Sequence, residues 1–201
     1  MANYYISDMH LFHANVTAEG TNFDGRPFQT LNEMHEEILK RWNAKINNDD
    51  DIYLLGDTAW KENEDAIALI ARLKGKKHAI KGNHCRFKDA RYKQLFVEIC
   101  DYKELTDNAD GKNYNLVLSH YPILMWNGQH KGRIHLFGHV HNTYDNEFYQ
   151  KCLAELNEWY KDRDGERYTP FVAYNVGAML DYMDFTPRTL KEIIDANRTE
   201  M

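Results

Sequence analysis

Short runs of apolar residues alternate along the chain with segments in which apolar residues recur every three or four positions. The short runs predict buried strands, because they are too brief for a buried helix and are bounded by glycine or polar residues. The recurring spacing predicts amphipathic helices with one apolar side. Strands that alternate with helices indicate an α/β fold built from layered sheets. The predicted strands lie at residues 4–7, 52–55, 77–81, 116–118, 134–137 and 171–177.

The clearest predicted helix begins after Thr30, where Thr30 and Glu33 have the spacing of a capping box. Its apolar stripe extends through Trp42 to Ile46, and His35 falls off that stripe, so we expect His35 to be solvated. The charged segment at 145–164 is interpreted as a surface helix that either contacts a second subunit or caps a pocket. Further helices are predicted at residues 64–75 and 92–99, and after Thr189.

Polar residues follow five of the predicted strands at the point where each strand ends. These residues are Asp8 and His10, Asp57, Asn83 and His84, His120, and His139 with His141. The C-terminal ends of strands in an open α/β sheet converge on one crevice, so we expect these side chains to meet in space. Apart from His84, these residues comprise two carboxylates, four histidines and one amide, which are too many ligands for one tetrahedral ion. They suit two ions about 3.5–4 Å apart that share a carboxylate.

The types of ligand restrict which ions are expected. Carboxylate and amide oxygens combined with imidazoles favour Mn²⁺, Fe²⁺ or Fe³⁺, Zn²⁺ or Ni²⁺ over calcium. The three cysteines are Cys85, Cys100 and Cys152, and none of them forms a C-x-x-C pair. An odd number of unpaired cysteines is typical of reduced thiols, so we expect a cytoplasmic protein without a disulfide framework.

Length and composition limit the remaining possibilities. We expect the 201 residues to form a single domain over 1–201, and 43% hydrophobic with 28% charged residues is typical of a soluble globular protein. The net charge of −6 argues against an extended nucleic-acid surface, which would need a basic face. Residues 1–3 lead directly into a predicted strand, and no apolar run approaches the length of a membrane span. We therefore expect no membrane partner.

The motifs as a set resemble the calcineurin-like metallophosphoesterase family over nearly the whole chain. That resemblance implies a layered β-sandwich of mixed sheets flanked by helices. The shared motifs are Asp8-Met9-His10, Gly56-Asp57, Gly82-Asn83-His84, His120 and Gly138-His139-Val140-His141. Small bacterial and phage phosphoesterases of this family look most similar, because they also share Phe12-His13-Ala14-Asn15, Gly25-Arg26-Pro27-Phe28, Trp126-Asn127 and Asn175-Val176-Gly177.

The same resemblance implies a role for each matched residue. One ion would be held by Asp8, His10, Asp57 and His141; Asp57 would bridge, and Asn83, His120 and His139 would complete the second ion. A hydroxide between the ions would attack phosphorus in line. His84 would act as general acid or orient the substrate. Cys85 stands where the family usually has an acidic residue, so a hydroxyl or carboxylate of a nearby loop would have to orient His84.

The expected reaction is hydrolysis of a phosphodiester or phosphomonoester on a small, nucleotide-like substrate. The candidate substrate contacts are few: His13, Arg26, Arg86, His130 and Arg133. Two alternatives remain open, namely a non-catalytic metal-bound interaction scaffold and a nuclease that acts on single strands. The sequence does not specify the substrate, the preference for mono- or diesters, the native metal, or whether the protein is a homodimer.

Overall fold

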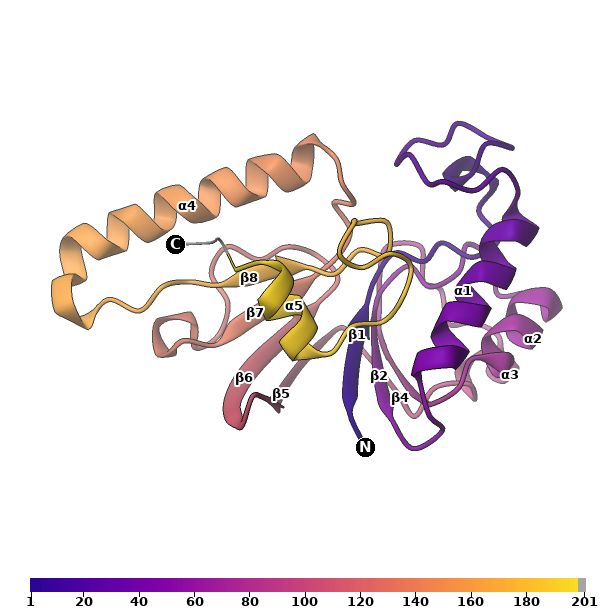
Figure 1. Ribbon diagram of the computed structural model, residues 1–201, viewed down its shortest axis with the longest axis horizontal. Coiled ribbons are helices and arrows are strands. Elements are labelled where there is room, and N and C mark those ends of the chain that lie inside the picture. The colour runs from indigo at the N-terminus through magenta and orange to yellow at the C-terminus, as the bar shows by residue number, and fades with distance from the viewer. Residues whose placement is uncertain (199–201) are drawn as a thin grey trace.

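Two four-stranded sheets form the centre of the structure, a computed structural model that describes residues 1–198 (Figure 1). Helices α1, α2 and α3 lie on one side of the first sheet, and the long helix α4 lies beyond the second (Figure 1). The arrangement confirms the prediction of a mixed α/β fold with two sheets flanked by helices.

The first sheet has the order β1-β2-β3-β4, and all of its neighbouring strands are parallel. Parallel strands are usually covered on both faces, which explains their continuous apolar runs. The strands are β1 (Asn3–Ile6), β2 (Asp51–Leu55), β3 (Lys76–Ile80) and β4 (Glu98–Cys100). Because they are parallel, their C-terminal ends all lie at one edge of the sheet.

The second sheet is mixed and has the order β5-β6-β7-β8. Only β5 runs antiparallel to its neighbour, whereas β6, β7 and β8 are mutually parallel. The strands are β5 (Tyr102–Ala109), β6 (Lys112–Ser119), β7 (Ile134–Phe137) and β8 (Ala173–Asn175). The ends of β6 and β7 therefore supply a second set of C-terminal strand ends.

The helices begin at the capping residues that the sequence indicated. The hydroxyl of Thr30 accepts the backbone N–H of Glu33 at 3.1 Å, and Thr189 forms a complete capping box with Glu192. Among residues 1–198, no helix combines the length and apolar character needed to span a lipid bilayer. The helices are α1 (Leu31–Lys45), α2 (Glu64–Arg72), α3 (Ala90–Lys93), α4 (Tyr144–Asp164) and α5 (Leu190–Ala196), with 3₁₀ turns η1 (Ala14–Val16), η2 (Gln129–Lys131) and η3 (Gly165–Arg167).

Two local predictions were wrong. The predicted helix at 92–99 ends early, because α3 stops at Lys93 and the chain then pairs with β3 as strand β4. His35 is buried instead of solvated, and its Nε2 accepts the backbone N–H of Phe12 at 3.0 Å. A loop from a distant part of the chain covers that side of α1, which helical spacing alone does not reveal.

A short backbone contact joins the two sheets at their C-terminal ends. Ser7 follows β1, donates its N–H to the carbonyl of Val176 and accepts the N–H of Ala178. Ser7 thereby pairs in parallel with Gly177, two residues beyond β8. Gly138 follows β7 at the same place, and a Cβ there would overlap the side chains of Ser7 and Asp8. The strand ends of both sheets consequently meet along one seam.

The two buried histidines His35 and His135 should make stability depend on pH. Burial lowers the pKa of each to about 4, so both stay neutral in the folded protein where the unfolded chain, with a pKa of about 6.5, is protonated. Their contribution to the free energy of unfolding is complete above pH ~6.5. It is lost as the pH falls towards 4, because the unfolded state then binds more protons than the folded state. Between pH 7 and 5 each should reduce the free energy of unfolding by ~2 kcal/mol.

Urea unfolding of wild type and His35→Gln at pH 7 and pH 5 measures this effect. The variant should lose ~2 kcal/mol less than wild type over that interval. Asn32→Ala, at an exposed residue of the same helix, removes no titratable group and serves as the control. Equal pH slopes for wild type and His35→Gln would contradict the assignment of a neutral, buried His35.

Candidate functional site

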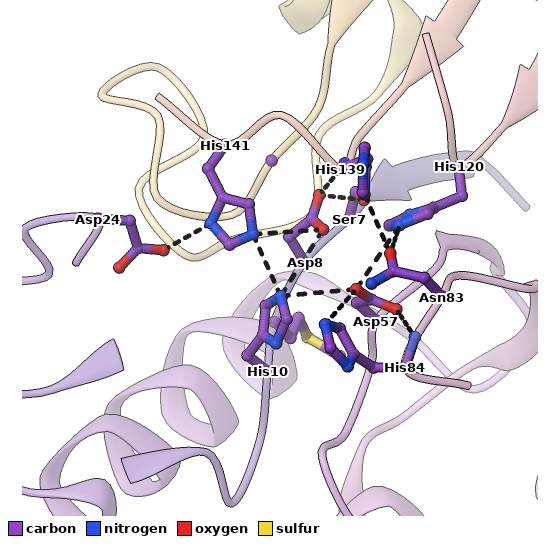
Figure 2. Close-up of polar contacts among 12 residues, drawn as sticks. Ser7, Asp8, His10, Asp24, Asp57, Asn83, His84, His120, His139 and His141 are labelled. Atoms are coloured by element: carbon purple, nitrogen blue, oxygen red, sulfur yellow. Dashed lines mark hydrogen bonds and ion pairs between the residues drawn. The ribbon is translucent and has the colours of Figure 1, made fainter. Parts of the chain in front are cut away.

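The polar residues that follow the strands gather at the seam between the sheets. Asp57 lies in the middle of the group, with imidazoles of both sheets directed towards it (Figure 2). The first sheet contributes Asp8, His10, Asp57, Asn83 and His84, and the second contributes His120, His139 and His141. All eight side chains that were predicted to meet after the strands therefore lie in one cluster.

One part of this cluster is formed by Asp8, His10 and His141. The Nε2 atoms of His10 and His141 are 3.2 Å apart, and Oδ1 of Asp8 lies 3.8 Å from each of them. Oδ2 of Asp57 is 3.7 Å from Nε2 of His10. Ligand atoms of Asp8, His10 and His141, one from each residue, lie within 4.8 Å of one another, an arrangement that could hold a metal ion.

The other part is formed by Asn83, His120 and His139. Oδ1 of Asn83 lies 2.9 Å from Nε2 of His120 and 3.0 Å from Nδ1 of His139. Oδ2 of Asp57 is 3.6 Å from Nε2 of His120, so Asp57 stands between the two parts. His139 and His141 therefore belong to different halves of the cluster, as the resemblance of the motifs implied.

Hydrogen bonds outside the cluster fix the orientation of two imidazoles. Nδ1 of His141 lies 2.8 Å from a carboxylate oxygen of Asp24, and Nδ1 of His120 lies 2.8 Å from the carbonyl oxygen of Leu55. Both partners are acceptors, so each Nδ1 carries a hydrogen, and in the neutral imidazole Nε2 is then the atom available to a metal ion at the centre. Such outer partners are typical of histidines that bind metals.

One carboxylate oxygen at the centre lacks a hydrogen-bond donor. Oδ1 of Asp8 is buried and has no hydrogen-bond partner among residues 1–198. The other carboxylate oxygen of Asp8 is engaged, because it accepts from the hydroxyl of Ser7 and from the N–H of His139. A buried acceptor without a donor is unfavourable unless a cation binds it. The arrangement fits divalent metal ions.

Burial shifts the pKa values of residues in the cluster towards neutral forms. Burial and the nearby imidazole of His141 hold the pKa of His10 well below its ordinary value. Burial also raises the pKa of Asp57, and the charge of Asp8 acts in the same direction. Neutral imidazoles are the form that coordinates metals.

The backbone at the cluster is strained. A positive φ is costly for residues that have a Cβ, and such strain concentrates at functional sites. Five residues of the cluster have positive φ, namely Asp8 (54°), His10 (48°), Asp57 (46°), His139 (72°) and His141 (49°). Gly82 contributes in a different way, because a Cβ there would overlap the carboxylate of Asp57.

His84 is held beside the cluster by its backbone and by an aromatic neighbour. Its N–H donates to Oδ1 of Asp57 at 2.9 Å, and its Nε2 lies 4.0 Å from Oδ2 of Asp57. The ring packs against Trp60 with centroids 4.5 Å apart, and Trp60 stacks on His13 at 3.9 Å. The side chain is 36% exposed, so it can reach both Asp57 and solvent.

A nearby carboxylate supports the loop that follows His84, where Cys85 replaces the acidic residue. Glu62 accepts the backbone N–H groups of four successive residues, 86–89, two on each carboxylate oxygen. Cys85 itself is a neutral thiol, since burial raises its pKa to about 11. Glu62 thus orders the loop through its backbone N–H groups. Among residues 1–198, no hydrogen bond or ion pair joins Glu62 to the ring of His84.

Two of the five predicted substrate contacts lie at the rim of the cluster, and the other three do not. His13 and Arg86 lie at the rim, since the ring of His13 is 5.4 Å from that of His10 and Arg86 is exposed close to His84. Arg133 forms an ion pair with Glu104 instead.

Arg26 and His130 lie where they cannot serve as the expected substrate contacts. Arg26 is only 2% exposed, and its guanidinium binds Asp24 and the carbonyl oxygens of Asp8 and Met9. It positions the backbone of the D-x-H motif. His130 lies in η2 before β7, at the opposite end of that strand from the cluster, and packs against Tyr160.

Ser7, Asp24, Trp60 and Glu62 were not identified from the sequence. Asp24 had a local signal, because it lies two residues before Arg26 in a shared motif and a buried arginine requires an acidic partner. Trp60 and Glu62 lie in the loop after Asp57 and carry no motif. Their contacts with the loop after β3 arise only from the fold.

The model of the calcineurin-like phosphoesterase family matches residues 4–198. The protein belongs to this family. An uncharacterized protein of Methanocaldococcus jannaschii is 32% identical over 115 residues, which cover 56% of this chain and 61% of that protein. A solved protein of unknown function from Aquifex aeolicus shares the fold, with a TM-score of 0.65, 24% identity and coverage of 96% of this chain and 98% of that one.

Glu62→Gln should loosen the loop after His84. One side of the glutamine amide accepts hydrogen bonds but the other donates, so two of the four backbone N–H groups lose their acceptor. Loss of hydrogen bonds to a charged acceptor should cost ~2 kcal/mol locally. Hydrogen exchange at residues 86–89 should accelerate about tenfold or more.

The matched control is Glu64→Gln, two residues away at an exposed carboxylate that forms an ion pair with the side chain of Arg91. Exchange at residues 86–89 should stay at the wild-type rate in that variant. If Glu62→Gln also left the exchange unchanged, Glu62 would not be what orders this loop.

Proposed function

We propose that the protein is a metal-dependent phosphoesterase with a dinuclear centre that hydrolyses small phosphoesters. The observation that carries the proposal is the convergence of carboxylate, amide and imidazole ligands on both sides of Asp57, where Oδ1 of Asp8 has no hydrogen-bond partner among residues 1–198. Membership of the calcineurin-like phosphoesterase family supports the same chemistry.

The residues that would hold the ions follow from the two halves of the cluster. Asp8, His10 and His141 would hold one ion, Asn83, His120 and His139 would hold the other, and Asp57 would contribute to both. When bound, the two ions would polarise the phosphoryl oxygens and supply a water of lowered pKa as nucleophile. Oxygen and imidazole ligands favour Mn²⁺, Fe, Zn²⁺ or Ni²⁺.

His84 is the proposed proton donor to the leaving oxygen. Its ring is fixed by Trp60 on one side and by the backbone bond to Asp57, yet it remains partly open to solvent. A group in that position can stabilise the departing alkoxide by protonation. His13 and Arg86 at the rim would contact the phosphate or the group attached to it.

The exposed charges near the site favour a small substrate. The protein carries a net charge of −6, and its cations near the cluster are few, so a long nucleic acid would gain little from them. The alternatives of a single-strand nuclease and of a non-catalytic scaffold draw no support from any specific contact. Three cysteines without disulfides are consistent with our proposal of a cytoplasmic location.

Replacement of Asp57 should abolish activity and weaken metal binding. Asp57→Asn removes the charge shared by both halves, so hydrolysis of bis-p-nitrophenyl phosphate with Mn²⁺ should fall at least ~1000-fold, or ~4 kcal/mol. In a thermal-shift assay, Mn²⁺ should raise the Tm of wild type more than that of the variant. Asp49→Asn changes an exposed carboxylate and should match wild type in both assays. An active Asp57→Asn protein would refute the mechanism.

Replacement of His84 should matter most for poor leaving groups. His84→Ala should reduce hydrolysis of a p-nitrophenyl diester less than ~10-fold, because nitrophenolate leaves without a proton, and that of a phenyl diester ~100-fold or more. The rates of both esters measured with Mn²⁺ give the comparison, and His130→Ala, remote from the cluster, should change neither. Equal losses on the two esters would argue that His84 positions the substrate and does not donate a proton.

A further inference from the structure

A cavity of about 470 Å³ opens on the outer side of His84. His84 lines this cavity and also approaches Asp57, with Nε2 of His84 4.0 Å from Oδ2 of Asp57. A group attached to the phosphorus on the side of His84 would therefore extend directly into the cavity. None of the proposed metal ligands lines it.

The acidic residues of the cavity are already engaged. Both oxygens of Glu62 accept backbone N–H groups of residues 86–89. Asp89 accepts the N–H of Arg91 at the start of α3 and forms an ion pair with the guanidinium of Arg91 at 3.0 Å. Neither carboxylate is turned towards a cation of the cavity.

The basic residues of the cavity are not engaged. Lys61, Arg86 and Lys88 line it and are exposed, and no ion pair joins any of them to a carboxylate among the side chains that the structure describes. The side chains of the cavity that form no ion pair therefore carry a positive net charge, although the protein as a whole is acidic. A concave positive surface attracts anions and raises their local concentration.

Trp60 lines the cavity beside His84. Its ring is held between His13 and His84, and 38% of its surface remains exposed. A fixed aromatic wall beside three cations suits a ligand that has an apolar or flat body and an anionic group at its end.

We propose that this cavity binds the leaving group of the substrate and that the leaving group carries an anionic phosphate or carboxylate. The proposal rests on the proposed phosphoesterase function. In the reaction, the oxygen of water bonds to phosphorus, the bond from phosphorus to the leaving oxygen breaks, and that oxygen takes a proton from His84. The proton released by the attacking water restores His84, and the anionic group on the leaving portion is unchanged.

A pair of matched esters tests the proposal. Methyl 4-carboxyphenyl phosphate and methyl 4-carbamoylphenyl phosphate release phenols of similar shape, of which only the first carries a charge. The ratio of their kcat/KM values, measured with Mn²⁺ at low ionic strength, should be ~10 in wild type, equivalent to ~1.4 kcal/mol. Because the groups are exposed, the ratio should decrease when ~0.5 M NaCl is added.

Charge removal inside and outside the cavity provides the matched comparison. The double variant Lys61→Gln/Lys88→Gln should lower the ratio to ~3 or less. Lys93→Gln removes a charge from α3 outside the cavity and should keep the wild-type ratio. A general loss of folding would reduce both rates together and leave the ratio unchanged, so the ratio reports the cavity alone.

The possible results distinguish the two proposals. Hydrolysis of both esters with a ratio near 1 in wild type, or a ratio that the double variant does not lower, overturns the cavity's role while the phosphoesterase function stands. Failure to hydrolyse these esters and bis-p-nitrophenyl phosphate with Mn²⁺, Zn²⁺, Ni²⁺ and Fe²⁺ overturns the phosphoesterase function and the leaving-group pocket with it.

Discussion

The crowding of buried polar ligand groups between the two sheets is the constraint on which the rest of the structure depends. At the seam between the sheets, carboxylate, amide and imidazole groups lie about 3–4 Å apart, and Oδ1 of Asp8 has no hydrogen-bond donor among residues 1–198. Such an arrangement is costly unless cations occupy the centre, because buried charges and polar groups require partners. The surrounding fold holds these groups together against that cost.

Three features of the backbone keep the acceptors close. The parallel strands bring their C-terminal ends to one edge, and Ser7 ties that edge to the second sheet. Glycines at positions 82 and 138 let the chain pass within contact distance of the carboxylates of Asp57 and Asp8. Positive φ angles direct the ligand side chains inwards, which is strain that a well-packed core can sustain.

The sequence predicted the fold class and the membership of the cluster because both depend on local patterns. A polar residue directly after a buried strand, such as Asp57 or His120, has its place determined by the strand itself. The contacts of Glu62 with residues 86–89 join two loops 24 to 27 residues apart, and no periodicity predicts them. Arg26 was misread because arginines are usually exposed, whereas here Asp24 neutralises it in the interior.

The division of the cluster between the two sheets has a consequence for the whole molecule. Each half contains groups from both layers: His10 of the first sheet meets His141 of the second, and Asn83 of the first meets His120 and His139 of the second. Ions bound there would act as cross-links between two layers that are also joined by apolar packing and by hydrogen bonds such as those of Asn3 and Tyr5 with Asp107. A shift of one sheet relative to the other would separate both ligand sets at once. The centre can therefore be complete only while the two sheets are aligned.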